Sequence, residues 1–224
     1  VLEPSGDPVI AVLVDDADCY VMSNDKNLRP ILNAATDAGF GLHNVLVWDK
    51  VTPTANRWYM KNLEFTAYLW KGRAKTINDP SSKQLLRGGI DKEAGHPTEK
   101  PVALMEEYVR NSSAPGQVVL DPFMGSGTTG VACMRLGRKF IGIEIHEPFF
   151  DMAVARLRAG ETGLAFAQIS AIFSGVADLK KVFEAARLRR TTGRQTLLFV
   201  DEIHRFNRAQ QDSFLPVMED GTVI

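Results

Sequence analysis

The segment Val118-Val-Leu-Asp-Pro-Phe-Met-Gly-Ser-Gly-Thr-Thr129 joins an apolar run to an acid, a glycine turn and the start of a helix. The next unit, Lys139-Phe-Ile-Gly-Ile-Glu-Ile145, is again apolar and carries an acid near its end. This succession is typical of a nucleoside-binding crevice, in which the backbone approaches the ligand and the second acid accepts hydrogen bonds from ribose hydroxyls. The sequence therefore predicts a nucleoside site formed by Asp121, the turn at 125–127 and Glu144.

The same turn differs from a loop that binds phosphate groups. A phosphate-binding P-loop has the pattern G-x-x-x-x-G-K-[ST], in which the lysine neutralises phosphate charge. Here Gly127 is followed by Thr128 and Thr129, and the turn carries no lysine. A glycine turn flanked by acids favours a ligand with little negative charge.

Composition excludes several classes of protein. The 224 residues have a net charge of −1 and are 45% hydrophobic, as expected for a soluble globular protein. Cys19 and Cys133 are far apart, and the four histidines lack metal-ligand spacing, so we expect neither a disulfide scaffold nor a metal site. No apolar run approaches the roughly 20 residues of a membrane span, and no signal-peptide pattern is present at the N-terminus. These features predict a cytoplasmic protein.

Hydrophobic periodicity predicts strands that alternate with helices, which indicates an α/β fold with parallel sheet. Strands are expected at 9–14, 19–22, 42–48, 65–70, 118–120, 139–145, 166–170 and 196–200. Helices are expected after an Asp25 cap, at 97–110, at 126–136, at 148–157 and around Leu179–Ala186. Residues 71–95 are basic and aperiodic and are expected to be a mobile loop. The pattern changes near residue 160, which predicts two domains, 1–160 and 161–224.

Residues 19–158 resemble the permuted SAM-dependent DNA amino-methyltransferases, which modify adenine N6 or cytosine N4. The matching segments, in order, are Tyr20-Val-Met-Ser-Asn-Asp-Lys-Asn-Leu28, Gly39-Phe-Gly-Leu-His-Asn-Val-Leu-Val-Trp-Asp-Lys50, Asn62-Leu-Glu-Phe-Thr-Ala-Tyr-Leu-Trp-Lys-Gly72, His96-Pro-Thr-Glu-Lys-Pro101, the glycine-turn segment and Ile141-Gly-Ile-Glu144. The resemblance implies a Rossmann-like sheet, SAM as cofactor, double-stranded DNA as partner, and adenine rather than cytosine as target. It implies that the cofactor is bound by Asp121, Pro122, Phe123, Gly125, Ser126, Gly127, Thr128 and Glu144, with Thr98 and Lys100 at its methionine end.

The catalytic motif of that family is absent from its expected position. The motif is an Asp or Ser followed by Pro-Pro and an aromatic residue, and it holds the target amine of a flipped base. The chain has only Asp7-Pro8-Val9-Ile10 there, with no aromatic residue and too little spacing before Tyr20. The catalytic residues are therefore unknown, and the methyltransferase sheet is predicted to be incomplete. We hypothesise that residues 9–14 fill the place of the missing strand.

Residues 161–224 resemble a different family, the clamp-loader-like AAA+ ATPases of bacterial replication-associated recombination. The resemblance rests on Ser170-Ala-Ile-Phe-Ser-Gly-Val-Ala-Asp-Leu179, Leu197-Leu-Phe-Val-Asp-Glu-Ile-His-Arg-Phe-Asn207, residues 210–216 and residues 219–224. It implies that Asp201 and Glu202 form a Walker B acid pair that serves Mg²⁺ and the attacking water. The Walker A loop expected before Thr162 is absent, so this half is predicted to be a partial P-loop-type segment that does not hydrolyse Mg-ATP.

Simpler interpretations stand beside these. The chain is alternatively a module that binds SAM or DNA without turnover, an AAA+ fragment that makes protein contacts, or an inactive fusion remnant. Lys50, Arg57 and Lys61 beside Trp58 and Tyr59 form either a DNA-facing patch or ordinary packing with solvated charges. The basic residues of the 71–95 loop either follow DNA phosphates or simply keep a loop soluble. These basic residues are Lys71, Arg73, Lys75, Lys83 and Arg87.

Overall fold

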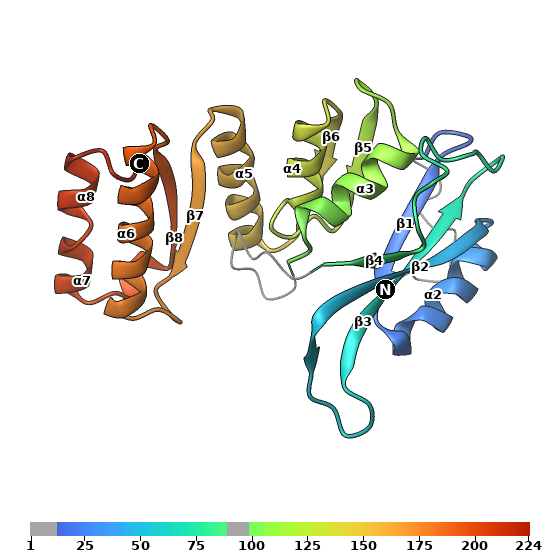
Figure 1. Cartoon of the computed structure of the whole chain (residues 1–224), viewed down its shortest axis with the longest axis horizontal. Coiled ribbons are helices and arrows are strands. Elements are labelled where there is room, and N and C mark those ends of the chain that lie inside the picture. Colours follow the sequence, from blue (N-terminus) through green and yellow to red (C-terminus); the bar gives the residue numbers. More distant parts are fainter. Residues whose placement is uncertain (1–12, 89–98) are drawn as a thin grey trace. The chain divides into compact units, whose positions relative to one another are not determined.

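The computed structural model describes residues 13–88 and 99–224 (Figure 1). The chain divides into two compact units. The first comprises Val1–Ile90 with Arg110–Ser112, and the second comprises Asp91–Val109 with Ser113–Ile224. Within the described residues, no helix is both long and apolar enough to cross a membrane.

The first unit is built on a four-stranded sheet in the order β1-β3-β2-β4. The strands are β1 (Asp18–Ser23), β2 (Gly41–Thr54), β3 (Lys61–Trp70) and the short β4 (Leu85–Arg87). β3 pairs antiparallel with both β1 and β2, and only β2 and β4 are parallel. The prediction of a parallel sheet is therefore wrong for this unit. The reason is that β2 and β3 form a hairpin, because only residues 55–60 connect them.

Helix α2 (Asp25–Asp37) covers one face of this sheet (Figure 1). Its cap is Asn24 rather than the predicted Asp25, because the Asn24 side chain accepts hydrogen bonds from the amides of residues 26 and 27, both at 3.0 Å. The helix ends at Asp37, and Gly39 follows with a φ of 90°, which permits the chain to reverse. Ala35 packs against Ala67 and Leu69 of β3 in the core of this unit.

The expected loop at 71–95 contains ordered structure, so that expectation is wrong for part of its length. β4 pairs with β2, and the indole Nε1 of Trp48 donates a hydrogen bond to the Gly88 carbonyl at 3.0 Å. Three residues are too few to show a sequence period, which explains why the pattern did not reveal this strand. Residues 89–95 lie outside the described part of the chain.

The proposed strand at 9–14 lies largely outside the described residues. Leu13 and Val14, which the structure does describe, form no strand, and Val14 is exposed. The hypothesis that this segment fills a gap in the sheet therefore has no support from its last two residues.

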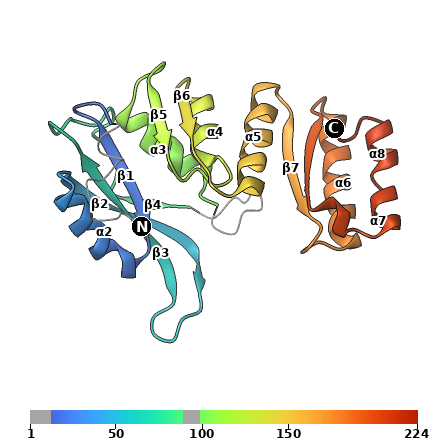
Figure 2. The same cartoon turned by 180° about the vertical axis from the view of Figure 1, so that it is seen from behind.

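The second unit contains the predicted strand–turn–helix–strand segment (Figure 2). β5 (Val118–Asp121) and β6 (Lys139–Gly142) are parallel, with Asp121 opposite Gly142, and α4 (Thr128–Arg135) connects them. Two longer helices belong to the same stretch of chain, α3 (Val102–Ser112) before β5 and α5 (Glu147–Glu161) after β6. Parallel pairing brings the carboxyl ends of β5 and β6 to the same edge.

Residues 165–224 also lie in the second unit. β7 (Ala165–Ser170) and β8 (Thr196–Asp201) are parallel, joined by α6 (Val176–Thr191). After β8 come a 3-10 turn (η1, Ile203–Arg205), α7 (Arg208–Asp212) and α8 (Leu215–Glu219). Leu179, Phe183, Phe214 and Val217 belong to their shared core. Helix α5 contacts both β7 and β8 and runs through residue 160, so the proposed domain boundary falls within its last turn.

Candidate functional site

The acid at the end of β5 fastens the start of the glycine turn. Asp121 Oδ1 accepts a hydrogen bond from the Phe123 amide at 3.0 Å, and Oδ2 accepts one from the Thr129 hydroxyl at 2.6 Å. The first bond closes a turn of the Asx type, and the second ties the strand end to α4. Asp121 thereby fixes where the chain leaves the sheet and where the helix begins.

Glu144, the acid after β6, lies against the same turn. Its Oε2 accepts a hydrogen bond from the Gly125 amide at 3.0 Å, and its Oε1 accepts one from the His146 amide at 2.8 Å. A carboxylate offers about four acceptor positions, so these two bonds leave about two positions for a ligand. The structure thus brings Asp121, Gly125 and Glu144 together at the carboxyl ends of two parallel strands.

The turn itself requires glycine at two positions. Gly125 has φ 51° and Gly127 has φ 77°, a backbone region that favours glycine. A Cβ built on Gly127 would lie 3.0 Å from Cβ of Ala153 in α5, so α5 packs directly on the turn. Gly127 is also the N-cap residue of α4, immediately before its first residue, Thr128.

The other predicted residues are placed differently. Ser126 and Thr128 are buried, and the Thr128 hydroxyl accepts a hydrogen bond from Arg156 Nη1 at 3.1 Å. Pro122 is half-buried, whereas the Phe123 side chain is 76% exposed. Lys100 is half-buried just before α3, and Thr98 lies outside the described residues. The Ser126 hydroxyl also lies within 3.5 Å of Arg156 Nη1.

Two residues of this site escaped the sequence analysis. Glu99 and Arg156 form a buried ion pair of 2.9 Å next to the turn. Arg156 sits on α5 among residues that the helical pattern assigns to the protein interior, where a charged side chain is rare without a partner. A charged residue at an interior position of the helical pattern was the one feature of the sequence that could have indicated Arg156. Its partners are identified only by the fold.

In the C-terminal part of the chain, Asp201 ends β8 and Glu202 follows in the left-handed region, with φ 53°. Glu202 Oε2 lies 2.9 Å from His204 Nε2 and 3.9 Å from Arg205 Nε. The two acids thus adjoin at the carboxyl end of β8, and Glu202 is engaged with neighbours from its own turn.

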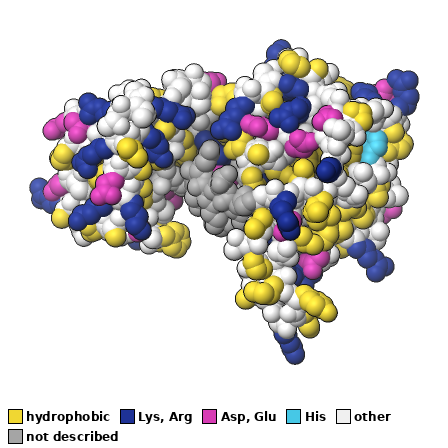
Figure 3. Space-filling view, viewed as in Figure 1, with side chains coloured by type: hydrophobic (Ala, Val, Ile, Leu, Met, Phe, Trp, Pro, Cys, Tyr) yellow, Lys and Arg dark blue, Asp and Glu magenta, His cyan; other side chains and the backbone are white. Residues whose placement is uncertain are grey.

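A second candidate surface lies at the end of the β2–β3 hairpin in the first unit. Trp58 is 71% exposed and Tyr59 is 92% exposed, and Figure 3 shows hydrophobic and basic side chains together on the projecting hairpin. The Arg57 guanidinium lies 6.0 Å from the centre of the Trp58 ring. Exposed aromatic side chains next to a cation are typical of a binding surface rather than of core packing.

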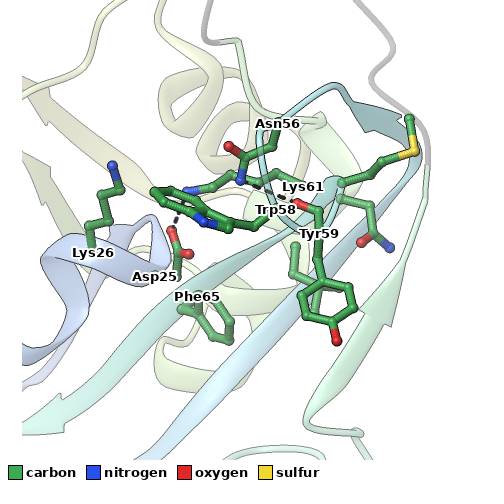
Figure 4. A pocket seen from close by; sticks show the side chains of 10 residues that line it. Asp25, Lys26, Asn56, Trp58, Tyr59, Lys61 and Phe65 are labelled. Carbon is green, nitrogen blue, oxygen red and sulfur yellow. Dashed lines mark hydrogen bonds and ion pairs between the residues drawn. The ribbon is translucent and has the colours of Figure 1, made fainter.

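A groove of about 280 Å³ runs between this hairpin and the start of α2 (Figure 4). Lys61 donates a hydrogen bond to Asp25 at 2.7 Å across it, and this bond holds the pKa of the Asp25 carboxyl below its usual range. Lys50 pairs with Glu64 at 3.4 Å. Of the three basic residues in the predicted patch, two are therefore neutralised by acids.

The basic residues of the 71–95 segment are also engaged within the first unit. Arg73 pairs with Asp16 at 2.8 Å, Arg87 with Asp49 at 2.9 Å, and Lys71 lies 3.8 Å from Asp15. These pairs favour the structural interpretation of the three residues over a row of phosphate contacts.

Comparison with known proteins agrees with this architecture. The DNA methylase family model N6_N4_Mtase matches residues 1–155. The type II methyltransferases M2.DpnII of Streptococcus pneumoniae and M2.LlaDCHI of Lactococcus lactis subsp. cremoris are each 32% identical to the chain, over 168 and 171 residues. These alignments cover 66% and 67% of this chain but 63% and 64% of the relatives, so the chain spans just under two thirds of their length.

A solved structure shows the same fold. The M1.HpyAVI–SAM complex matches with a TM-score of 0.58 at 32% identity, over 65% of this chain and 76% of that one. The family match includes the glycine turn, Glu144 and the hairpin, and it ends before β7. Because the model matches well over half of the sequence, this chain belongs to the N6_N4_Mtase family of DNA methylases.

Proposed function

We propose that residues 1–160 bind SAM and serve methyl transfer to the exocyclic amine of adenine in DNA, with cytosine N4 as the less favoured target. The observation that carries this proposal is the bond from the Gly125 amide to Glu144, which joins the turn after β5 to the acid after β6. The residues fit the cofactor, because two carboxylates and no turn lysine suit a sulfonium and a ribose better than a phosphate.

Each residue has a defined part in this proposal. The remaining acceptor positions of Glu144 bind the ribose hydroxyls, and Asp121 fixes the start of the turn through its bonds to Phe123 and Thr129. The exposed Phe123 ring is available to cover an apolar part of the ligand. By family resemblance, Lys100 and Thr98 lie near the methionine end. SAM supplies the activated methyl group, and the chain orients it toward the amine.

The proposed partner is double-stranded DNA, contacted through Trp58, Tyr59 and Arg57. Aromatic faces stack on bases of any sequence, and a guanidinium neutralises phosphate. Two observations support this contact. Both rings are exposed next to Arg57, and among the described residues Arg57 forms no ion pair, whereas Lys50 and Lys61 do. The protein acts in the cytoplasm in this proposal.

For residues 161–224 we propose a segment of AAA+ descent whose part is protein contact rather than ATP hydrolysis. Its support is the strand β8 with Asp201 and Glu202 at its end. A partial P-loop-type domain that lacks a Walker A loop has no cradle for the nucleotide phosphates. An ATPase rate that Glu202→Gln abolishes would overturn this proposal.

The decisive experiment is isothermal calorimetry of SAM with the whole chain. Glu144→Ala should weaken binding by at least about tenfold, the effect of removing hydrogen bonds to a charged group. Asp121→Ala should weaken it as well, through the loosened turn. Glu147→Ala, an exposed acid at the start of α5, is the matched control and should bind like the parent chain.

Two outcomes separate the candidate functions. An absence of binding at millimolar SAM would exclude both the methyltransferase and the SAM-module interpretation. Binding without transfer of labelled methyl to mixed-sequence DNA would favour the module that binds without turnover.

A further inference from the structure

The side chains of Glu99 and Arg156 form an ion pair deep in the second unit. Arg156 Nη2 lies 2.9 Å from Glu99 Oε1, and the two side chains are only 2% and 0% exposed. Glu99 precedes α3, and Arg156 lies in the middle of α5. The pair therefore connects two segments that lie 57 positions apart in the sequence, since 156 minus 99 is 57.

The same guanidinium also holds the glycine turn. Arg156 Nη1 donates hydrogen bonds to the Ser126 carbonyl at 3.3 Å and to the Thr128 hydroxyl at 3.1 Å. Ser126 stands between Gly125 and Gly127, two residues with positive φ. A serine between two glycines has little conformational restraint of its own, so the turn needs an external contact to keep one shape.

A buried ion pair is an inefficient way to stabilise a fold. The two charges lose their hydration, and an apolar pair of similar volume often serves stability as well or better. What an apolar pair cannot do is donate to a turn carbonyl and a hydroxyl while anchored to a carboxylate. The contacts of Arg156 therefore indicate that it fixes the geometry of the turn rather than adding to the stability of the fold.

We propose that Arg156, held by Glu99, is a positioning residue that sets the shape of the Gly125–Thr128 turn for SAM. This inference rests on the proposed SAM site. Arg156 joins three parts of that site, namely the segment before α3, the glycine turn and helix α5. Binding benefits because the turn is arranged before the ligand arrives, so less ordering is needed on binding.

The test separates positioning from stability by replacing the pair with apolar side chains. The double variant Glu99→Met/Arg156→Met should lose less melting temperature than Arg156→Met alone, because both charges leave together and Glu99 is not left buried without its cation. Its SAM dissociation constant in calorimetry should nevertheless rise by about tenfold, which is the size of effect expected when residues that contact each other are changed. Arg158→Met, an exposed arginine on the same helix, is the matched control and should change neither quantity.

If the double variant does not fold, Arg156→Lys and Glu99→Gln give the answer. Lysine keeps the charge but lacks the planar fork that reaches the turn and Glu99 together. A folded Arg156→Lys chain should bind SAM several-fold more weakly, and parental affinity in any folded variant of this pair would overturn the inference.

Amide hydrogen exchange provides a measurement that does not depend on SAM. Exchange at Gly125–Thr128 should quicken in the Arg156 variants, while exchange in β1 and β3 of the first unit stays unchanged. If the parent chain fails to bind SAM but this local change appears, the proposed cofactor is wrong and the positioning contact stands. Unchanged exchange at the turn would refute the positioning role itself.

Discussion

The Gly125 amide donates a hydrogen bond to Glu144 Oε2 at 3.0 Å, across 19 positions of sequence. Through this one contact the acid after β6 helps to close the turn after β5. Glu144 is thus part of the frame of the site as well as a candidate ligand-binding group. A change at Glu144 should therefore alter both the turn and its affinity for a ligand.

The close packing of α5 on the turn can be tested with two glycines that share a left-handed backbone. Gly137→Ala, at φ 71° and with nothing within 4 Å of the new Cβ, should cost only the backbone term of about 1–2 kcal/mol. Gly127→Ala adds a 3.0 Å approach to Ala153 Cβ and should lower stability by about 1–3 kcal/mol more. Urea unfolding measures both, and equal losses would mean that α5 moves aside freely.

Asp49 should make the first unit sensitive to acid. The Val51 amide, followed by the Arg87 and Asn62 side chains, holds the pKa of the Asp49 carboxyl below its usual range. The resulting stability is present above the unfolded pKa of about 3.9 and is lost as pH falls through the lower folded value. Asp49→Asn should therefore lower the urea midpoint at pH 7, and its difference from the parent chain should shrink below about pH 4.

Asp37→Asn, which removes an exposed acid from the last turn of α2, is the control for that pH series. It should shift the midpoint little at any pH. A deficit of Asp49→Asn that stays constant from pH 7 to pH 3 would show that shape, not charge, is what Asp49 contributes.

Cys133 should resist alkylation in the folded chain. It is fully buried in α4, and burial raises the pKa of its thiol to about 11. At pH 8 the thiolate population is then about two orders of magnitude below that of an unfolded cysteine. Mass spectrometry after iodoacetamide treatment should find Cys133 unmodified in buffer and modified in urea. Rapid labelling in buffer would contradict the packing of α4.

The hairpin should contribute to DNA binding through its two aromatic rings and Arg57. Trp58→Ala and Tyr59→Ala should each weaken binding by about 1–3 kcal/mol if a base stacks on the ring. Arg57→Ala should reduce the salt dependence by about one counterion. Fluorescence anisotropy at several salt concentrations measures both effects, with Leu42→Ala, an exposed apolar change elsewhere on β2, as control. Unaltered affinity in all three hairpin variants would assign DNA contact to another surface.

Local pattern predicted the elements well where the chain has a clear period and strong terminal signals. β1, α4, β7 and β8 lie within a few residues of expectation, and Gly39 follows the end of α2 at Asp37, as expected for a terminating glycine. The failures have local causes: β4 is too short to show a period, and the pairing direction of β2 and β3 depends on the short connection between them rather than on composition. Asn24 replaced Asp25 as the cap because both are good capping residues and only the backbone angles decide between them.

The sequence by itself determined the order of the elements, the acid and glycine positions of the turn and the family motifs, because each of these is a matter of spacing along the chain. Only the tertiary structure decided that Glu144 bonds Gly125, that Arg156 reaches Ser126 and Glu99, and that Lys61 and Arg87 are taken up by acids. Those contacts join residues tens of positions apart. The partner of each residue depends on which strands and helices pack together, and this cannot be inferred from the residues next to it in the sequence.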